Sequence, residues 1–307
     1  MQIVAVINYK GGVGKTTATA NLAAELAWRG HKILVLDLDP QASLTFSFVK
    51  PDYWQNVLAK DKTIKAWFES FSTGSPIDLQ SLIIEPDAAK NKLTGRGSVS
   101  LIPSHLGLIN VDLELATELG GATLKQSKEN FLKVHRRLAD ELANIDPEEY
   151  ELILMDCPPN FNITTKTAIV ASDSILIPAK PDYLSTLGID YLIRNLNKLI
   201  ADYNDYANLD KDKPEPTIDP KILGVVFTMI QIYCGEPISS QRPFIAQTRK
   251  LDVPVFDEYI RENKTMFADA PQYGVPVVLN AYSAGTHSDV VKEIEGFVSE
   301  FAKKVSL

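Results

Sequence analysis

The stretch from Lys10 to Thr17, Lys-Gly-Gly-Val-Gly-Lys-Thr-Thr, constrains the fold of this chain more than any other. It follows a short apolar run, Ile3 to Ile7, that is typical of a buried strand. It precedes an apolar-periodic run rich in helix formers, Thr19 to Ala27. Strand, glycine-rich loop and helix in this order are the context of a phosphate-binding loop, in which glycines let backbone N–H groups converge on phosphate oxygens. The stretch therefore predicts a nucleotide site near the start of the chain.

The residue types in this loop indicate separate tasks. We expect Lys15 to bring a positive charge to the β and γ phosphates, and the Thr16 hydroxyl to ligate Mg²⁺. The loop departs from the ordinary pattern, because Tyr9 stands where a glycine is usual and a second lysine, Lys10, precedes the glycines. The residues expected to cradle phosphate are Gly11, Gly12, Val13, Gly14, Lys15, Thr16 and Thr17.

With its second lysine, the loop resembles the deviant Walker A loop of the ParA/MinD family of ATPases. The resemblance implies that Lys10 reaches across a dimer interface to the nucleotide of the partner subunit, while Lys15 serves the nucleotide of its own subunit. ATP would then hold a homodimer together as well as being the substrate. Lys10 and Lys15 are accordingly predicted catalytic residues.

Two carboxylates follow the next predicted strand, Lys32 to Asp37. Asp37 and Asp39 stand at i and i+2 beyond that strand, where open α/β sheets bind ligands. Turn formation and helix capping are the alternative interpretation of these residues. The run Asp37 to Gln41 resembles the Asp-x-Asp-Pro-Gln motif of the same family. The resemblance implies that Asp39 positions the attacking water and that Asp37 supports the Mg²⁺ shell.

A third motif completes the predicted phosphate and metal site. The apolar run from Tyr150 ends in Asp156 and two prolines, which is a Walker B arrangement. In such an arrangement the carboxylate holds Mg²⁺. The metal site is thus expected at Thr16, Asp37 and Asp156, with ATP and Mg²⁺ as cofactors.

The adenine contacts are predicted from the resemblance alone. Strand Ile222–Met229 ends in Thr228 and Met229, where the family places residues against the adenine. Arg261 follows Ile260, at which the family commonly has proline, and Asp269 replaces a glutamate of the family pattern. Met229 and Arg261 are the two predicted contacts.

The alternation of strands and helices predicts a doubly wound, mostly parallel sheet with helices on both faces, the P-loop NTPase class. We expect one domain over residues 1–307, with a helical elaboration at about 44–100. A long helical stretch is predicted from Val111 to Asn144, with His135 on its surface. The apolar stripe from Val290 to Val305 predicts a C-terminal helix packed on the core.

Composition and charge limit the classes of function that are open to this chain. A net charge of −8 and a pI near 5.1 argue against a chain that coats nucleic acid by bulk charge, although they leave room for a local basic patch. No apolar run approaches the roughly 18 residues of a membrane span, and no secretory signal is visible. The polar face of the C-terminal helix is mixed in charge, whereas a membrane-surface helix would be basic. We therefore expect a cytoplasmic protein without a membrane partner.

The leading hypothesis is a ParA-like switch that segregates or positions a cargo: a plasmid, a chromosome or a large protein assembly. The resemblance implies that the ATP-bound dimer binds DNA without sequence preference and associates with the nucleoid. It also implies that a ParB-type or cargo-adaptor protein stimulates hydrolysis. Candidate DNA contacts, each also interpretable as an ordinary solvated charge, are Arg194, Lys198, Arg242, Arg249 and Lys250.

Two other classes stay open. One is a reductase-like or protein-targeting relative within the same ATPase family, which would need cysteines placed to bridge two subunits. Cys157 directly follows the Walker B carboxylate and Cys234 is isolated in the sequence. The other is a scaffold that binds nucleotide only to dimerise, without significant hydrolysis.

Overall fold

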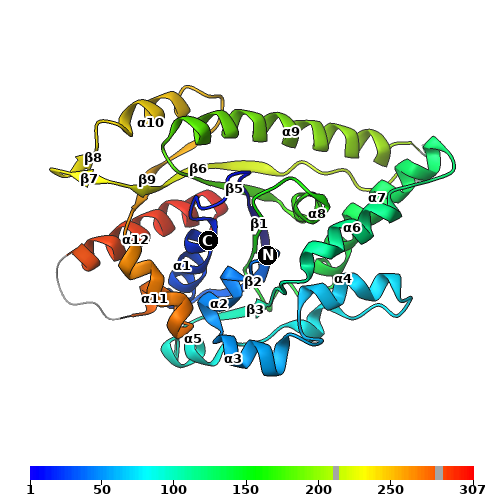
Figure 1. Ribbon diagram of the computed structural model, residues 1–307, viewed down its shortest axis with the longest axis horizontal. Coiled ribbons are helices and arrows are strands. Elements are labelled where there is room, and N and C mark those ends of the chain that lie inside the picture. The colour runs from blue at the N-terminus through cyan, green and yellow to red at the C-terminus, as the bar shows by residue number, and fades with distance from the viewer. Residues whose placement is uncertain (210–213, 281–285) are drawn as a thin grey trace.

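A seven-stranded parallel sheet forms the centre of the computed structural model, which describes residues 1–209, 214–280 and 286–307 (Figure 1). Its strand order is β3-β2-β4-β1-β5-β6-β9, and every neighbouring pair is parallel. The strands are β1 (Gln2–Val6), β2 (Lys32–Asp37), β3 (Ser98–Ile102), β4 (Leu152–Asp156), β5 (Ser174–Ala179), β6 (Lys221–Ile230) and β9 (Val255–Arg261). The predicted fold class is confirmed.

Twelve α-helices and one small hairpin are assigned within the described residues, together with a π-helix at Trp54–Leu58 and 3₁₀ helices at Leu79–Leu82 and Val277–Leu279. The hairpin consists of β7 (Ile232–Tyr233) and β8 (Glu236–Pro237). The helices are α1 (Lys15–Trp28), α2 (Ser43–Phe48), α3 (Pro51–Tyr53), α4 (Ile64–Ser72), α5 (Asp87–Lys92), α6 (Leu108–Glu118), α7 (Leu124–Leu142), α8 (Ile163–Ala171), α9 (Tyr183–Ala207), α10 (Arg242–Thr248), α11 (Lys264–Tyr273) and α12 (Thr286–Val305).

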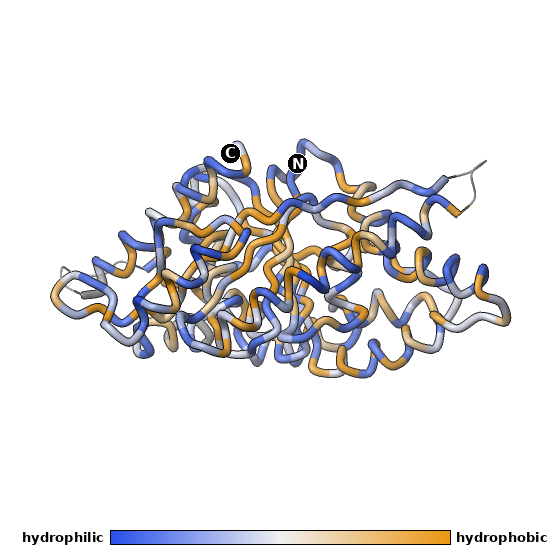
Figure 2. The backbone as a smooth tube through the Cα atoms, turned by 90° about the horizontal axis from the view of Figure 1, so that it is seen from above, coloured by the Kyte–Doolittle hydropathy of each residue, from blue (hydrophilic) through white to orange (hydrophobic). Residues whose placement is uncertain are grey.

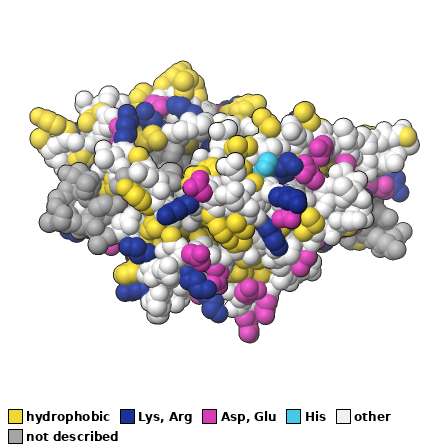
Figure 3. Space-filling model, turned by 60° about the horizontal axis from the view of Figure 1, so that its bottom comes forward, with side chains coloured by type: hydrophobic (Ala, Val, Ile, Leu, Met, Phe, Trp, Pro, Cys, Tyr) yellow, Lys and Arg dark blue, Asp and Glu magenta, His cyan; other side chains and the backbone are white. Residues whose placement is uncertain are grey.

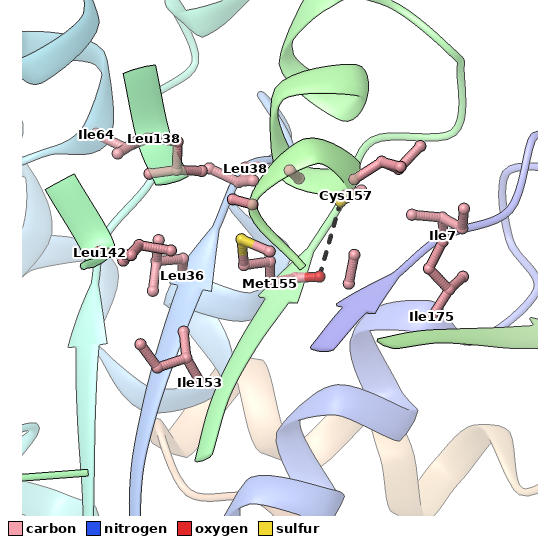
Figure 4. Close-up of a cluster of buried hydrophobic side chains, with 14 of the residues drawn as sticks. Ile7, Leu36, Leu38, Ile64, Leu138, Leu142, Ile153, Met155, Cys157 and Ile175 are labelled. Carbon is pink, nitrogen blue, oxygen red and sulfur yellow. Dashed lines mark hydrogen bonds between the residues drawn. The ribbon is translucent and has the colours of Figure 1, made fainter. Parts of the chain in front are cut away.

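The strands bury both faces because successive side chains point to opposite sides of the sheet. In β1, Val4 and Val6 join a core with α1, α2 and α12, whereas Ala5 joins a core with α4, α6, α7, α8 and α9. Figure 4 shows part of the second core, and Figure 2 shows the apolar segments running through the middle of the molecule. This explains why the strands are apolar without alternation.

The predicted helical stretch from about Val111 to Asn144 is helical over most of its length, but it is not continuous. The segment forms two helices, α6 and α7, which are separated by Gly120 and Gly121. Glycine disfavours the helix interior, and Thr123 starts the second helix by accepting a hydrogen bond from the Gln126 amide at 3.2 Å. The C-terminal prediction is confirmed, since the apolar stripe of α12 is buried against the sheet.

His135 is buried, and the prediction of a surface position is wrong. The ring stacks on Phe131 with centroids 4.1 Å apart, and Nδ1 lies 2.8 Å from the Phe131 carbonyl oxygen. Nε2 has no hydrogen-bond partner among the described residues. Burial lowers the pKa of His135 to about 4, so the folded chain holds this ring neutral.

We expect acid to destabilise the fold through His135. The unfolded chain binds a proton near pH 6.5, while the folded chain does so only near pH 4, so stability falls as the pH drops through this window. Between pH 7.5 and 5.5 the free energy of unfolding should fall by about 1 kcal/mol through this group. Urea unfolding at the two pH values measures it. A His135→Leu variant should lose this dependence and a His31→Leu control should keep it; an unchanged slope in His135→Leu would contradict the account.

The surface carries charges of both signs. On the face that Figure 3 shows, lysines and arginines are interspersed with aspartates and glutamates. Within the described residues, no helix is both long enough and apolar enough to cross a membrane.

Candidate functional site

The loop after β1 forms a cradle at the carboxyl edge of the sheet. Gly12 and Gly14 have φ of +69° and +75°, which favours glycine over residues with a Cβ. A Cβ on Gly14 would also lie 3.3 Å from the Thr228 side chain, a tight contact that adds to the preference for glycine there. Helix α1 begins directly after Gly14, which leaves its first amides directed at the cradle.

A cleft of about 400 Å³ opens over this loop. It is lined by the loop itself, by Asp39 and by polar residues of α1 and α2. An adjoining cavity of about 330 Å³ shares Gly14, Thr17, Met229 and Phe267 with the cleft and continues past Ile260 and Arg261. The lining residues of the cleft are Gly11, Gly12, Val13, Gly14, Lys15, Thr16, Thr17, Ala20, Asn21, Asp39, Gln41, Ser43, Ser47, Pro159, Met229 and Phe267.

The carboxylate of Asp156 lies next to the Thr16 hydroxyl, which donates to Asp156 Oδ2 at 2.6 Å. Its other oxygen, Oδ1, is buried and has no hydrogen-bond partner among the described residues. Burial raises the pKa of Asp156 to about 7, although the Thr16 bond and the Lys15 charge oppose the rise. A buried, unpartnered carboxylate oxygen beside a hydroxyl fits a hard cation such as Mg²⁺.

Asp37 and Asp39 differ in their surroundings although they are two residues apart. Asp37 Oδ2 accepts bonds from the Thr45 amide and hydroxyl, both at 2.7 Å, and it lies behind the cleft rather than lining it. Burial and the neighbouring Asp156 raise the pKa of Asp37 well above its usual range. Asp39 lines the cleft, and its Oδ1 accepts from the Gln41 amide at 2.9 Å. The two predicted acidic residues are thus close together, but only Asp39 faces the cleft.

Lys10 turns away from the cleft of its own chain. Its Nζ lies 2.7 Å from Asp182 Oδ2 and 3.3 Å from Ser185 Oγ, at the start of α9. Although burial opposes the shift, hydrogen bonds from Lys10 and from the Ser185 amide hold the pKa of Asp182 below its usual value. Lys10 is absent from the lining of the cleft, whereas Lys15 is part of it.

The two predicted adenine contacts both line the adjoining cavity. Met229, the next-to-last residue of β6, has φ of 54° and lines both the cleft and the cavity. Arg261 is fixed to α12, because its Nη2 lies 2.6 Å from Glu293 Oε1. The side chain of Asp269 falls outside the described residues.

The predicted DNA contacts lie on two helices that are in contact, α9 and α10, and around the end of α10. All five are exposed. Arg194 pairs with Asp190 at 2.7 Å, and Arg249 lies 3.7 Å from Asp257. They do not touch the nucleotide cleft.

Sequence reasoning missed three residues at this edge of the sheet: Asp182, Thr228 as a partner of the loop, and Gln241. The Thr228 hydroxyl donates to the Val13 carbonyl at 2.6 Å, across 215 positions of sequence. Asp182 follows strand β5 and could have been suspected from that position alone. No local pattern marks Gln241.

Comparison with known protein families places residues 1–209 in a family described as AAA domain. The chain is 27% identical to the sporulation initiation inhibitor protein Soj of Bacillus subtilis, over 95% of this chain and 98% of that protein. It is 27% identical to the chromosome partitioning protein ParA of Caulobacter vibrioides, over 91% of this chain and 87% of that protein. A candidate replication protein A of Sinorhizobium fredii is 29% identical over 74% of this chain, and the match spans 53% of that protein.

Solved structures share the fold. A candidate plasmid partition protein of Borrelia burgdorferi bound to AMPPNP superposes with a TM-score of 0.67 and 20% identity, covering 99% of both chains. Apo McdA of Cyanothece superposes with a TM-score of 0.67 at 20% identity, and the match covers 98% of this chain and 99% of that chain. Cobyrinic acid a,c-diamide synthase of Mycobacterium smegmatis, with an ATP analogue and magnesium, superposes with a TM-score of 0.61 at 22% identity. The match covers 89% of this chain and 91% of that chain.

Proposed function

Because the chain belongs to the AAA domain family and is similar along most of its length to ParA-type partition ATPases, we propose that it is an ATP-hydrolysing switch. In this proposal ATP and Mg²⁺ close a homodimer, the dimer binds DNA without sequence preference, and hydrolysis releases it. The cargo would be a plasmid, a chromosome or a large protein assembly. We further propose one ATPase domain over residues 1–307, acting in the cytoplasm and on the nucleoid.

The residues that line the cleft fit the two cofactors together with Asp156, which is buried beside Thr16 and does not itself line the cleft. Backbone amides of Gly11 to Thr17 and the Lys15 ammonium would hold the phosphates. The Thr16 hydroxyl and the Asp156 carboxylate would hold Mg²⁺, which neutralises charge on the β and γ phosphates when bound. Asp37 would support this site from behind, through its bonds to Thr45 and the Asp39 amide.

Asp39 is the residue that we propose to orient water for attack. Asp39 lines the same cleft as the phosphate-binding loop, and its Oδ1 accepts a hydrogen bond from the Gln41 amide. Because this hydrogen bond already fixes the carboxylate, Asp39 does not need to reorient when it aligns a water for attack. Met229 and Arg261, which line the adjoining cavity, would contact the adenine.

The observation that carries the dimer proposal is the position of Lys10. Its ammonium stays outside the cleft of its own chain and is held at the rim by Asp182 and Ser185. Around it, Tyr183, Leu184 and Leu187 of α9 are 59%, 66% and 50% exposed. Exposed apolar side chains grouped on one helix end favour an interaction surface. A second copy seated there would receive Lys10 at its nucleotide.

DNA binding is proposed through Arg194, Lys198, Arg242, Arg249 and Lys250. We expect binding to random-sequence DNA only with ATP and Mg²⁺, and a steep decline with salt because phosphate contacts release counterions. An Arg194→Ala/Arg249→Ala variant should bind more weakly and lower the slope of log affinity against log salt by up to about 2. Filter binding over a salt series measures both quantities.

The matched control is Lys92→Ala on α5, which lies on the far side of the molecule from α9 and α10 in Figure 1. It should leave both the affinity and the salt slope unchanged. Equal DNA binding with and without ATP would contradict the switch, and an unchanged slope in the double variant would contradict this choice of residues.

A partner protein of ParB or cargo-adaptor type would stimulate hydrolysis, as the resemblance implies. Two alternatives to the switch are tested by other observations. A reductase-like relative needs cysteines at the surface between subunits. Cys157 is enclosed in the core with its thiol directed at the Met155 carbonyl (Figure 4), which leaves one exposed cysteine, Cys234. A scaffold without significant hydrolysis would show the same phosphate release before and after loss of Asp39.

A further inference from the structure

Met229 adopts a backbone conformation that side chains with a Cβ rarely occupy. Its φ is 54°, in the left-handed region. The pairing between β6 and β9 shifts register between Thr228 and Ile230, so the chain is irregular at Met229. Strained residues of this kind persist where the surroundings hold them, and they concentrate at functional sites.

One side chain holds the backbone at this irregularity and just after it. Gln241 Nε2 donates to the Met229 carbonyl at 3.1 Å, and Gln241 Oε1 accepts from the Gln231 amide at 2.9 Å. A neutral side-chain amide offers both the donor and the acceptor that this arrangement uses. Gln241 is buried, with 6% of its surface exposed, so water competes little for these bonds.

The opposite side of Met229 is tied to the phosphate loop. The hydroxyl of Thr228, the preceding residue, donates to the Val13 carbonyl at 2.6 Å. Met229 is therefore held between the loop and Gln241, and it is the residue of β6 that lines both the cleft and the adjoining cavity.

We propose that Gln241 is a positioning residue for nucleobase binding. It keeps Met229 in the left-handed conformation that presents its side chain at the boundary between the phosphate cleft and the adjoining cavity. This inference rests on the proposed function, because it assumes that a nucleotide occupies the two spaces together. Gln241 itself lines neither space, so it acts through Met229.

The test compares ligands with and without the nucleoside. Binding of ADP and of pyrophosphate, each with Mg²⁺, is measured by calorimetry for the wild type, Gln241→Leu and Gln241→Glu. Leu removes both bonds, while ionised Glu keeps an acceptor for the Gln231 amide but brings no donor to the Met229 carbonyl. ADP affinity should fall about tenfold in both variants, as expected for the loss of one or two hydrogen bonds. Pyrophosphate affinity should change less than about twofold.

The control is Gln247→Leu, an exposed glutamine on α10, which should bind both ligands like the wild type. Equal losses for ADP and pyrophosphate, or no loss of ADP affinity, would overturn the role of Gln241 and leave the proposed function intact. A wild type that binds no nucleotide at all would instead overturn the proposed function.

A second measurement isolates the conformation from the side chain. Glycine adopts positive φ freely, so a Met229→Gly chain should not need Gln241 to hold that residue. Gln241→Leu should then lower ADP affinity less than about threefold in the Met229→Gly background, against about tenfold in the wild type. Equal fold-losses in the two backgrounds would overturn the proposal.

Discussion

Replacing Asp39 with alanine should slow ATP hydrolysis by at least about a hundredfold while ATP binding stays within about twofold of the wild type. Asp39 faces the cleft, but the phosphate-binding amides, Lys15 and Thr16 come from another segment. The variant therefore loses the group proposed to orient water and keeps the cradle. Phosphate release and calorimetric ATP binding, measured on the same preparation, separate the two effects.

The matched controls for Asp39 are two other aspartates. Asp52→Ala, an exposed position on α3, should hydrolyse ATP like the wild type. Asp37→Ala should instead lower stability, because it leaves the Thr45 amide and hydroxyl without their buried acceptor. Unchanged phosphate release in Asp39→Ala would contradict the proposed catalysis and favour the scaffold.

Replacing Lys10 with alanine should lower hydrolysis about a thousandfold, the order of effect seen when a charge supplied in trans is removed from phosphoryl transfer. The wild type should hydrolyse faster per subunit as its concentration rises, since one lysine comes from the partner. The variant should lose this dependence. A rate per subunit that stays constant across a wide dilution series of the wild type would contradict a role for Lys10 in trans.

Replacing Asp182, the partner of Lys10 within the chain, should have the opposite effect and strengthen dimerisation. Lys10 must leave Asp182 before it can reach another subunit, and the pair is about one-third exposed on each side. An exposed ion pair of this kind contributes at most about 1 kcal/mol. Asp182→Asn should therefore strengthen ATP-dependent dimerisation by up to about fivefold. Asparagine can still cap α9 by accepting from the Ser185 amide, so the helix should keep its start.

Much of the fold follows from the sequence because its strands are buried on both faces. The run from Lys32 to Asp37 is apolar without alternation, and β2 has the predicted bounds. The glycine-rich loop likewise predicted the position of the cleft, since its spacing has few other uses. In these places local residue types and the tertiary structure agree.

The rest depends on contacts between distant segments. Nothing near His135 in the sequence indicates that its helix, α7, packs against α8 and α9, and two glycines were too weak a signal to divide α6 from α7. The bond from Lys10 to Asp182 spans 172 positions. The left-handed φ of Met229 belongs to a residue that ordinarily avoids it, so only the folded chain reveals Gln241 as its support.

In the proposed switch, nucleotide binding and self-association are one event, joined by Lys10. Sedimentation velocity with a non-hydrolysable ATP analogue and Mg²⁺ measures this coupling, with the wild type and Lys10→Ala run at equal concentration. We expect a dimer for the wild type with the analogue, monomers without it, and monomers for Lys10→Ala in both conditions. A wild type that binds the analogue and remains monomeric at every concentration would contradict it.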